Sequence, residues 1–388
     1  MKNKVLLLTL VSTCLLVACN NSKGKRGESK GDEPFIDNLS AEIGSYYTEA
    51  QLNYLNNDDP SNTTPYNGNM SVSAPNPVVL SWEGLSKDCV LTIYNEDMEV
   101  EEAFGLDGNS YELYNLEFDK TYYWNVASED ERIISETMSF VIPRTVNGPR
   151  NLKIDGVENV RDIGGWSHKN NEGKLVPYMK QGMLYRSGRF NEDKATSVTP
   201  SITEDGIYEL AYHLGIKTEV DLRRTSTNEV GSLTDQSVLG ETVNYVQLPM
   251  IYEGQNILTY TGTAPRGSDT YSYNNPGAIK SFFELLADVN NYPINFHCSI
   301  GKDRTGCLAY LVEALMGFDE ETIYRDYMFT NFANAGMCKL QDDVLNRYGA
   351  TLNEYHGDNL QEKTYNYLHE EIGLAEEILN SVISILGV

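Results

Sequence analysis

One decapeptide carries the side chains of this chain that are best suited to chemistry. It reads His297-Cys298-Ser299-Ile300-Gly301-Lys302-Asp303-Arg304-Thr305-Gly306 and has the form Cys-x5-Arg. Apolar stretches precede and follow it, so we expect these residues, called the Cys-x5-Arg loop below, to connect a buried strand to a helix. Such a loop can turn successive backbone N–H groups toward one centre, which makes a binding site for a phosphate dianion.

The side chains of the Cys-x5-Arg loop suit the transfer of a phosphoryl group. The positive end of the helix that begins near Arg304 favours a bound anion and the thiolate form of Cys298. Arg304 offers a planar guanidinium that can hold two phosphoryl oxygens. A thiolate below a bound phosphate predicts attack on phosphorus and then hydrolysis of a phosphocysteine. The residues expected to line the phosphate site are Ser299, Ile300, Gly301, Lys302 and Thr305, whose hydroxyl can also donate to the departing sulfur.

The decapeptide resembles the signature loop of a bacterial branch of the cysteine-dependent protein-tyrosine phosphatases. Four other segments are similar in the same order, namely residues 159–165, 184–187, 221–223 and 326–327, and the resemblance covers about residues 151–331. It implies that Cys298 is the nucleophile, that Arg304 is the phosphate clamp, and that Lys302 and Asp303 line the same loop. It also implies tyrosine phosphatase activity, extended in secreted members to dual-specificity and phosphoinositide activity.

The general acid is a second question, because cleavage of a phosphate ester needs a proton for the leaving oxygen. In the family that the loop resembles, a Leu-Pro-x-Pro-Asp turn can present an aspartate. The corresponding stretch here begins at Leu248 and has Tyr252 at the aspartate position, and it lacks the second proline. Asp303, inside the Cys-x5-Arg loop, is therefore our first choice for the acid, and Glu253 is the alternative.

Three classes of function fit these residues. The first is a phosphatase acting on phosphorylated proteins, phosphoinositides or small phosphoesters. The second is a phosphate-binding pseudo-enzyme or adaptor, and the third is a phytase-like enzyme acting on inositol phosphates. The intact Cys298 favours an enzyme, since a binding protein need not keep a nucleophile, and the charge of Lys302 would favour polyanionic head groups. No cofactor is expected, and the five His show no metal-ligand spacing, so no metal is predicted.

Other polar residues are expected to support the site. Asp162, Arg186, Asp221 and Arg223 are predicted to form a buried polar network, and His297 to orient the loop by donating hydrogen bonds. Cys307 lies on an apolar helix and is predicted to belong to the core. The Gly- and Tyr-rich segment 254–275 is a candidate lid over the site.

The amino terminus resembles the signal peptide of a bacterial lipoprotein. Lys2 and Lys4 precede an apolar run over residues 5–18 that is shorter than the about 20 residues of a membrane-spanning helix. Leu16-Val17-Ala18-Cys19 resembles a lipobox. This implies removal of residues 1–18, lipidation of Cys19, and an extracytoplasmic protein anchored to a bacterial membrane by its lipid. Residues 19–60 would form the tether.

The composition excludes one class of partner. The 388 residues include 30 Lys plus Arg and 56 Asp plus Glu, which gives a net charge of −26. Removal of Lys2 and Lys4 with the signal peptide would make it −28. Nucleic-acid binding is excluded, because it requires a basic surface that displaces counterions from phosphates. A hydrophobic fraction of 40% is enough for a folded core.

The remaining sequence predicts two folded domains. Residues 61–146 contain short β-type runs, which indicate a small all-β sandwich. This stretch resembles a fibronectin type III domain, with Trp82 in the core, Tyr122 at a tyrosine corner and no identified partner. Residues 147–388 alternate strands and helices, which predicts an α/β domain with a central, mostly parallel sheet flanked by helices. The resemblance at the Cys-x5-Arg loop implies that this domain has the cysteine-dependent phosphatase fold.

Overall fold

The computed structural model describes residues 34–63, 73–191, 201–224, 236–252, 256–263, 272–333 and 337–388. The chain divides into two compact units. The β unit comprises Met1–Gly44, Pro77–Leu113 and Lys120–Val141. The α/β unit comprises Ser45–Asn76, Tyr114–Asp119 and Ile142–Val388. The chain therefore passes between the units five times, after residues 44, 76, 113, 119 and 141.

The β unit has two antiparallel sheets in the part that the structure describes. One sheet has three strands in the order β1-β2-β5, and the other has four in the order β4-β3-β6-β7. Burial alternates along β3 and β6, as in sheets that bury one face, and Trp82 and Trp124 are buried. The bounds are β1 Ile36–Ile43, β2 Val78–Gly84, β3 Cys89–Tyr94, β4 Val100–Leu106, β5 Ser110–Leu113, β6 Thr121–Ser128 and β7 Met138–Val141.

The all-β character of this part was predicted and is confirmed, whereas the resemblance to a fibronectin type III domain stays a prediction. Tyr122 is buried and stacks on Phe140 with ring centroids 5.7 Å apart. The structure differs from the expected tether at β1, which pairs with β2 along its length. Its burial pattern is mostly exposed, so its backbone pairing rather than an apolar pattern makes it a strand.

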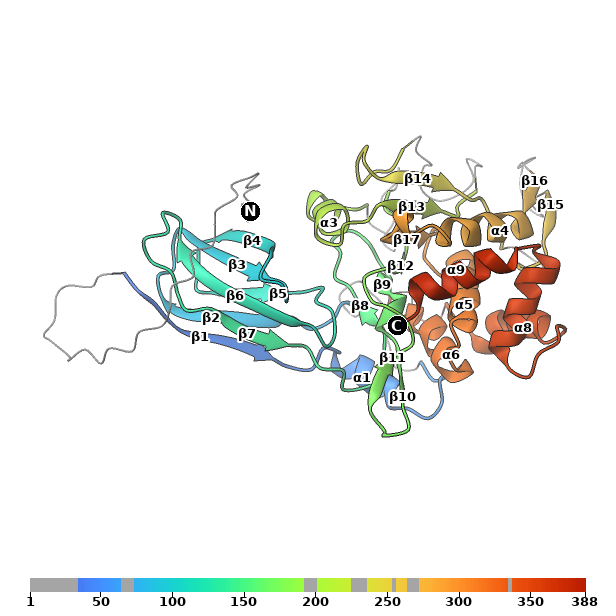
Figure 1. Cartoon of the computed structure of the whole chain (residues 1–388), viewed down its shortest axis with the longest axis horizontal. Helices are drawn as coiled ribbons and strands as arrows, with labels where there is room; N and C mark the ends of the chain where they lie inside the picture. The colour runs from blue at the N-terminus through green and yellow to red at the C-terminus, as the bar shows by residue number, and fades with distance from the viewer. Residues whose placement is uncertain are drawn as a thin grey trace, which may run out of the picture. The chain divides into compact units, whose positions relative to one another are not determined.

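The α/β unit is built on a six-stranded sheet in the order β14-β13-β17-β12-β9-β8 (Figure 1). The strands β14, β13, β17 and β12 are parallel, and β9 and β8 continue the sheet in antiparallel pairing. This confirms the predicted mostly parallel sheet. The bounds are β8 Arg150–Asn151, β9 Arg161–Asp162, β12 Leu184–Ser187, β13 Thr218–Asp221, β14 Asn244–Gln247 and β17 Ile294–His297.

Helices accompany this sheet, and the helix after β17 is the most deeply placed. Every residue of α5 (Asp303–Leu315) from Arg304 onward is buried, which fits the mostly apolar sequence of its middle, Cys307–Val312. In the described part of the chain, no helix is long and apolar enough to cross a membrane. The other bounds are α1 Glu49–Leu55, α3 Glu204–Tyr208, α4 Asn275–Leu286, α6 Glu320–Phe329, α7 Ala350–Leu352, α8 Leu360–Asn366 and α9 Glu376–Leu386; π-helical turns span Glu209–His213, Leu340–Gly349 and Tyr367–Glu371.

Two segments from the amino-terminal third of the chain belong to the α/β unit. Residues 114–119 provide Asn115, whose carbonyl accepts a hydrogen bond from Arg150 Nη1 at 2.9 Å. Residues 45–76 provide α1 and Tyr46, whose hydroxyl donates to the carbonyl of Asn151. The sequence predicted a single domain boundary at residue 147, whereas the structure assigns these two earlier segments to the α/β unit as well. One reason is that the buried Arg150 needs the Asn115 carbonyl as a hydrogen-bond acceptor.

Candidate active site

The Cys-x5-Arg loop lies at the carboxyl end of the central strand. β17 ends at His297 and α5 begins at Asp303, as the sequence predicts. The neighbours β12 and β13 run parallel to β17 and pair with His297 at Ser187 and Asp221. Open α/β sheets bind their ligands at this end of the strands. The sheet thus places Cys298, which follows the last residue of β17, at the edge where a ligand would bind.

Three consecutive carbonyl groups of the loop are held from outside. The Ser299 carbonyl accepts from the backbone N–H of Arg189 at 3.2 Å and from its Nη1 at 3.1 Å. The Ile300 carbonyl accepts from Asn159 Nδ2 at 3.1 Å, and the Gly301 carbonyl accepts from Arg186 Nη2 at 2.8 Å.

These contacts set the direction of the loop's N–H groups. In a trans peptide the N–H points opposite to the C=O. Carbonyls that are bound from outside therefore turn the N–H groups of Ile300, Gly301 and Lys302 toward the inside of the loop, where they form a nest for an anion. The turn requires Gly301 at φ +73°, a conformation that favours glycine.

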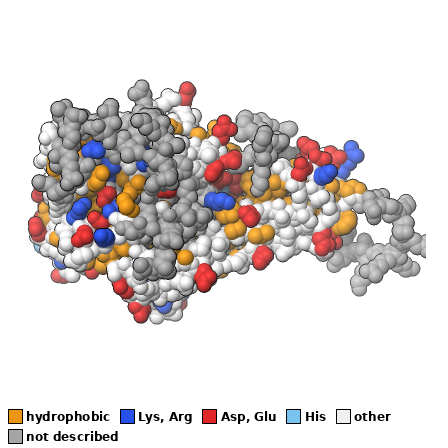
Figure 2. All heavy atoms as spheres, turned by 180° about the vertical axis from the view of Figure 1, so that it is seen from behind, with side chains coloured by type: hydrophobic (Ala, Val, Ile, Leu, Met, Phe, Trp, Pro, Cys, Tyr) orange, Lys and Arg blue, Asp and Glu red, His pale blue; other side chains and the backbone are white. Residues whose placement is uncertain are grey.

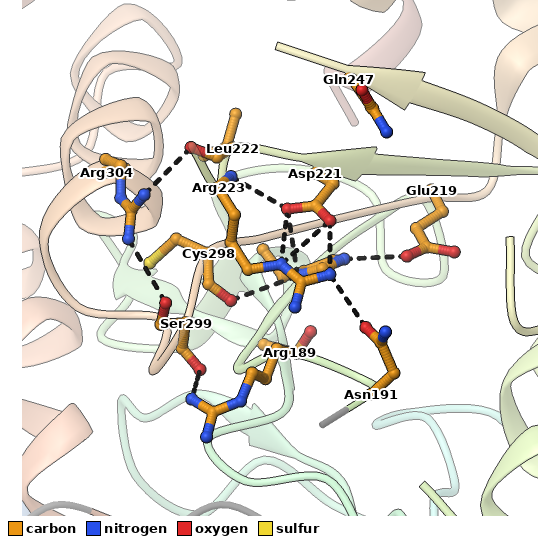
Figure 3. A network of polar contacts seen from close by, with 12 residues as sticks. Arg189, Asn191, Glu219, Asp221, Leu222, Arg223, Gln247, Cys298, Ser299 and Arg304 are labelled. Carbon is orange, nitrogen blue, oxygen red and sulfur yellow. Dashed lines mark hydrogen bonds and ion pairs between the residues drawn. The ribbon is translucent and has the colours of Figure 1, made fainter. Parts of the chain in front are cut away.

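Arg304 is positioned from several directions and extends over the same loop. Its Nη1 donates to the Leu222 carbonyl at 3.2 Å, and its Nη2 to Ser299 Oγ at 3.5 Å (Figure 3). Its Cζ lies 5.0 Å from the centre of the Tyr252 ring. Cys298 and Arg304 are each only 2% exposed. The structure thus brings together a buried thiol and a buried guanidinium, the pair that the sequence predicts.

His297 orients the residue that carries the thiol. Its Nδ1 lies 3.2 Å from the Cys298 carbonyl, and because a carbonyl only accepts, Nδ1 is the donor. Its Nε2 lies 2.9 Å from Glu219 Oε1, so the ring is held on both sides. This agrees with the predicted role of His297 in hydrogen bonding to the loop.

Glu219, Asp221 and His297 are close enough to share a metal ion, but the contacts indicate an ion-pair network. Asp221 accepts from Arg223 Nη2 at 2.6 Å and from the Tyr245 hydroxyl at 2.9 Å. Burial opposes ionisation of Asp221, yet His297 and Arg223 outweigh it and hold its pKa below the usual range. Asp162 and Arg186 are also buried in ion pairs, with Arg150 and Asp326. The four residues are thus buried and paired as predicted, but in separate ion pairs rather than in one network.

Lys302 and Asp303 contact each other and a third charge. Lys302 Nζ lies 3.6 Å from Asp303 Oδ1 and 3.1 Å from Asp343 Oδ2. Burial raises the pKa of Asp303; the Asp343 carboxylate adds to this effect and Lys302 opposes it. A carboxyl group with a raised pKa keeps its proton to higher pH, as a general acid requires. Asp343 is the closer of the two acidic residues that flank the extra positive charge of Lys302.

The structure locates the remaining predicted residues in part. Thr305 is fully buried, and its hydroxyl has no hydrogen-bond partner among the described residues. Cys307 is buried in the core, as predicted. Glu253 and Cys19 lie outside the described residues. The candidate lid is described only at 256–263 and 272–275, and its role stays a prediction.

Sequence reasoning missed several residues that shape the loop. Asn159 lies in one of the segments that carry the resemblance, and its φ of +59° is one that asparagine tolerates, so its motif was a usable signal. Arg189, Glu219 and Asp343 carry no local signal, because each acts on the loop from more than 35 residues away in the sequence, as their numbers show.

A family model described as the tyrosine phosphatase family matches residues 152–386, more than half of the chain. A candidate tyrosine-protein phosphatase of Cupriavidus necator, H16_A0669, is 26% identical over 210 residues, which cover 49% of this chain and 67% of that protein. A candidate tyrosine-protein phosphatase of Meyerozyma guilliermondii, OCA1, is 31% identical over 77 residues, which cover 18% of this chain and 42% of that protein.

Two solved structures are similar to part of the chain. The catalytic core of the PP-IP phosphatase Siw14 from S. cerevisiae has a TM-score of 0.26 and 18% identity, and the match covers 46% of this chain and 93% of that one. The structure of TpbA from P. aeruginosa has a TM-score of 0.28 and 19% identity, and the match covers 49% of this chain and 91% of that one.

Gly301→Ala should abolish binding at the loop. A Cβ at this position would lie 2.6 Å from the Ser187 carbonyl oxygen and 2.7 Å from Asn159 Nδ2, so the loop must move. We expect the dissociation constant for inorganic phosphate to rise at least about 100-fold, since strain of a few kcal/mol acts on the binding conformation. Isothermal titration calorimetry measures it.

Gly317→Ala is the matched control, because Gly317 also has a positive φ of +77° but meets only the flexible Gln361 side chain, at 3.3 Å. It should bind phosphate as the wild type does. Equal losses in both variants would show that backbone strain in general, and not the loop, explains the effect.

Proposed function

We propose, on the premise that this chain belongs to the tyrosine phosphatase family, that it hydrolyses phosphate monoesters through a phosphocysteine on Cys298. Family membership supports phosphatase activity. The observation that carries the proposal is the set of three outward-held carbonyls beside a buried thiol and a buried guanidinium. A site that only bound phosphate would need the nest and Arg304, but it would not need a thiol at its base.

The residues divide the reaction into two steps. The Cys298 thiolate attacks phosphorus, the bond from phosphorus to the leaving oxygen breaks, and that oxygen takes a proton from Asp303. The loop N–H groups and Arg304 stabilise the equatorial oxygens as charge develops on them. Water then attacks the phosphocysteine and gives a proton to Asp303. The sulfur leaves as a thiolate, to which the Thr305 hydroxyl donates, and inorganic phosphate is released.

Phosphotyrosine is the substrate that we propose, with phosphoinositides and other inositol phosphates as the alternatives. Lys302 would favour polyphosphorylated head groups if its charge were available, but Asp343 pairs with it at 3.1 Å. The Tyr252 ring beside Arg304 offers an aromatic surface next to the bound phosphate, which suits a phenyl ester.

The net charge of the chain supports the same choice. Figure 2 shows acidic side chains spread over the described part of one face, with Lys and Arg between them. With a net charge of −26, long-range forces repel highly charged anions more than singly phosphorylated side chains. A panel of phosphotyrosine peptides, phosphoinositides and inositol phosphates separates these substrates by their rates of phosphate release.

We also propose that the protein acts outside the cytoplasm, attached to a membrane through a lipid on Cys19. The charged, apolar and lipobox parts of residues 1–19 support this. Cells that produce the full chain should incorporate labelled palmitate into it, and Cys19→Ala should remove the label. Equal labelling of both proteins would contradict lipidation at Cys19.

Cys298→Ser should remove activity toward para-nitrophenyl phosphate. Serine keeps the shape of the side chain but is a far weaker nucleophile at neutral pH, so we expect kcat to fall at least about 1000-fold. The assay uses the full chain without added metal. Cys89→Ser, at a buried thiol of the β unit, is the control and should keep full activity. Wild-type turnover that survives in Cys298→Ser would refute the mechanism.

Asp303→Asn should affect poor leaving groups selectively. With phenyl phosphate we expect kcat to fall about 100-fold, the usual contribution of a general acid, and with 2,4-dinitrophenyl phosphate by less than about threefold. Because the acid must be protonated, wild-type kcat for phenyl phosphate should fall as pH rises through the raised pKa of Asp303. The variant should lack that descending limb. Equal losses on both substrates would point instead to Glu253 or another acid.

A further inference from the structure

Helix α1 is part of the α/β unit, although its sequence lies between the first two strands of the β unit. The Thr48 side chain caps the helix by accepting a hydrogen bond from the Gln51 N–H at 3.3 Å. Tyr54 is fully buried, and its ring centre lies 6.0 Å from that of Phe329 and 5.9 Å from that of Phe332. These contacts pack α1 against the end of α6.

Arg325 joins α6 to the carboxyl end of α1. Its Nη1 donates to the Tyr54 carbonyl at 2.9 Å, and its Nη2 donates to the Asn57 carbonyl. Its Cζ also lies 5.5 Å from the centre of the Tyr54 ring, and Glu321 accepts from its Nε at 2.9 Å. Arg325 therefore places a positive charge at the carboxyl end of α1, where the helix dipole favours a cation. The contacts fix α6 at the residue directly before Asp326.

Asp326 is fully buried and holds donors from three other parts of the chain. Its Oδ1 accepts from Arg161 Nε at 2.8 Å and from Trp166 Nε1 at 2.9 Å, and its Oδ2 accepts from Arg186. Burial opposes ionisation of Asp326, but Arg161 and Arg186 outweigh it and keep its pKa below the usual range. One ionised carboxylate therefore orients two buried guanidinium groups.

Both guanidinium groups lead to the Cys-x5-Arg loop. Arg186 Nη2 donates to the Gly301 carbonyl at 2.8 Å. Arg161 Nη1 donates to Asn159 Oδ1 at 2.5 Å, and the amide nitrogen of that asparagine donates to the Ile300 carbonyl at 3.1 Å. Two of the three outward-held carbonyls thus depend on Asp326.

We propose that Arg325 and helix α1 are positioning elements of the Cys-x5-Arg loop, so that the α1 segment, residues 48–57, sets how tightly the loop binds a phosphoryl group. This inference rests on the proposed function of the loop. α1 fixes α6, α6 fixes the Asp326 carboxylate, and the carboxylate fixes the two arginines that keep the loop carbonyls away from the anion. None of the α1 residues needs to touch the substrate for this effect.

Two variants of the full chain test the proposal. Arg325→Lys keeps the charge but loses the fork that reaches two carbonyls. Tyr54→Leu keeps the backbone carbonyl but removes the ring on which Arg325 lies. We expect each to raise the dissociation constant for orthotungstate, a phosphate-shaped anion that is not turned over, about tenfold. We also expect KM for para-nitrophenyl phosphate to rise by a similar factor. Calorimetry and initial rates measure the two quantities.

The variant Leu379→Ala distinguishes a positioning role from a general loss of stability. It removes a buried side chain of the same unit, in helix α9, far from α1 in the sequence. This control should lower the unfolding temperature and reduce activity only in proportion to the folded fraction, with the tungstate affinity kept within about twofold. The proposal is overturned if Arg325→Lys and Tyr54→Leu bind tungstate as tightly as the wild type while the wild type binds it well. A wild-type chain that binds no tungstate would overturn the proposed function itself.

Discussion

The site depends on a constraint of the peptide bond, in which C=O and N–H point in opposite directions. A loop can aim several N–H groups at one anion only if the matching carbonyls point away and find donors elsewhere. Buried carbonyls without donors would cost about 1–3 kcal/mol each. The chain supplies the donors from outside the loop, and they are Arg189, Asn159 and Arg186. Two of these side chains are themselves held by buried charges: Asn159 by Arg161, and Arg186 by Asp326.

The α/β unit can bury these ionised side chains because each lies against a side chain of opposite charge. Asp326 faces Arg161 and Arg186, and Asp221 faces Arg223. Breaking such a buried group by removing one partner leaves an uncompensated charge, which costs more than the pair contributes. The rigidity of the loop therefore depends on all of these buried ion pairs together. The parallel strands on both sides of β17 and the buried helix α5 hold the set in place.

The elements next to Cys298 in the sequence could be predicted, whereas contacts made by residues far away in the sequence could not. The strand, loop and helix around Cys298 follow from an apolar run, a glycine-containing turn and a second apolar run, and the structure has them. Asp303 and Lys302 were identified because they lie inside the motif. Asp343 forms an ion pair with Lys302 and so reduces the charge that Lys302 offers to a substrate. It belongs to a π-helical turn some 40 residues later in the chain. The eight-residue strand β1 was missed because its side chains do not alternate strongly between buried and exposed. Pairing partners far along the chain decide such features, and periodicity does not report them.

The placement of α1 has a consequence for the order in which the protein can fold during synthesis. Tyr54 meets Arg325, a residue 271 positions later in the chain. The ribosome releases α1 early, and at about 5–20 residues per second many seconds pass before its partner helix emerges. During that interval the Tyr54 ring has no α6 to pack on. The phosphate site therefore cannot be completed before α6 is available, and most of the chain must be made before the loop can take its binding form.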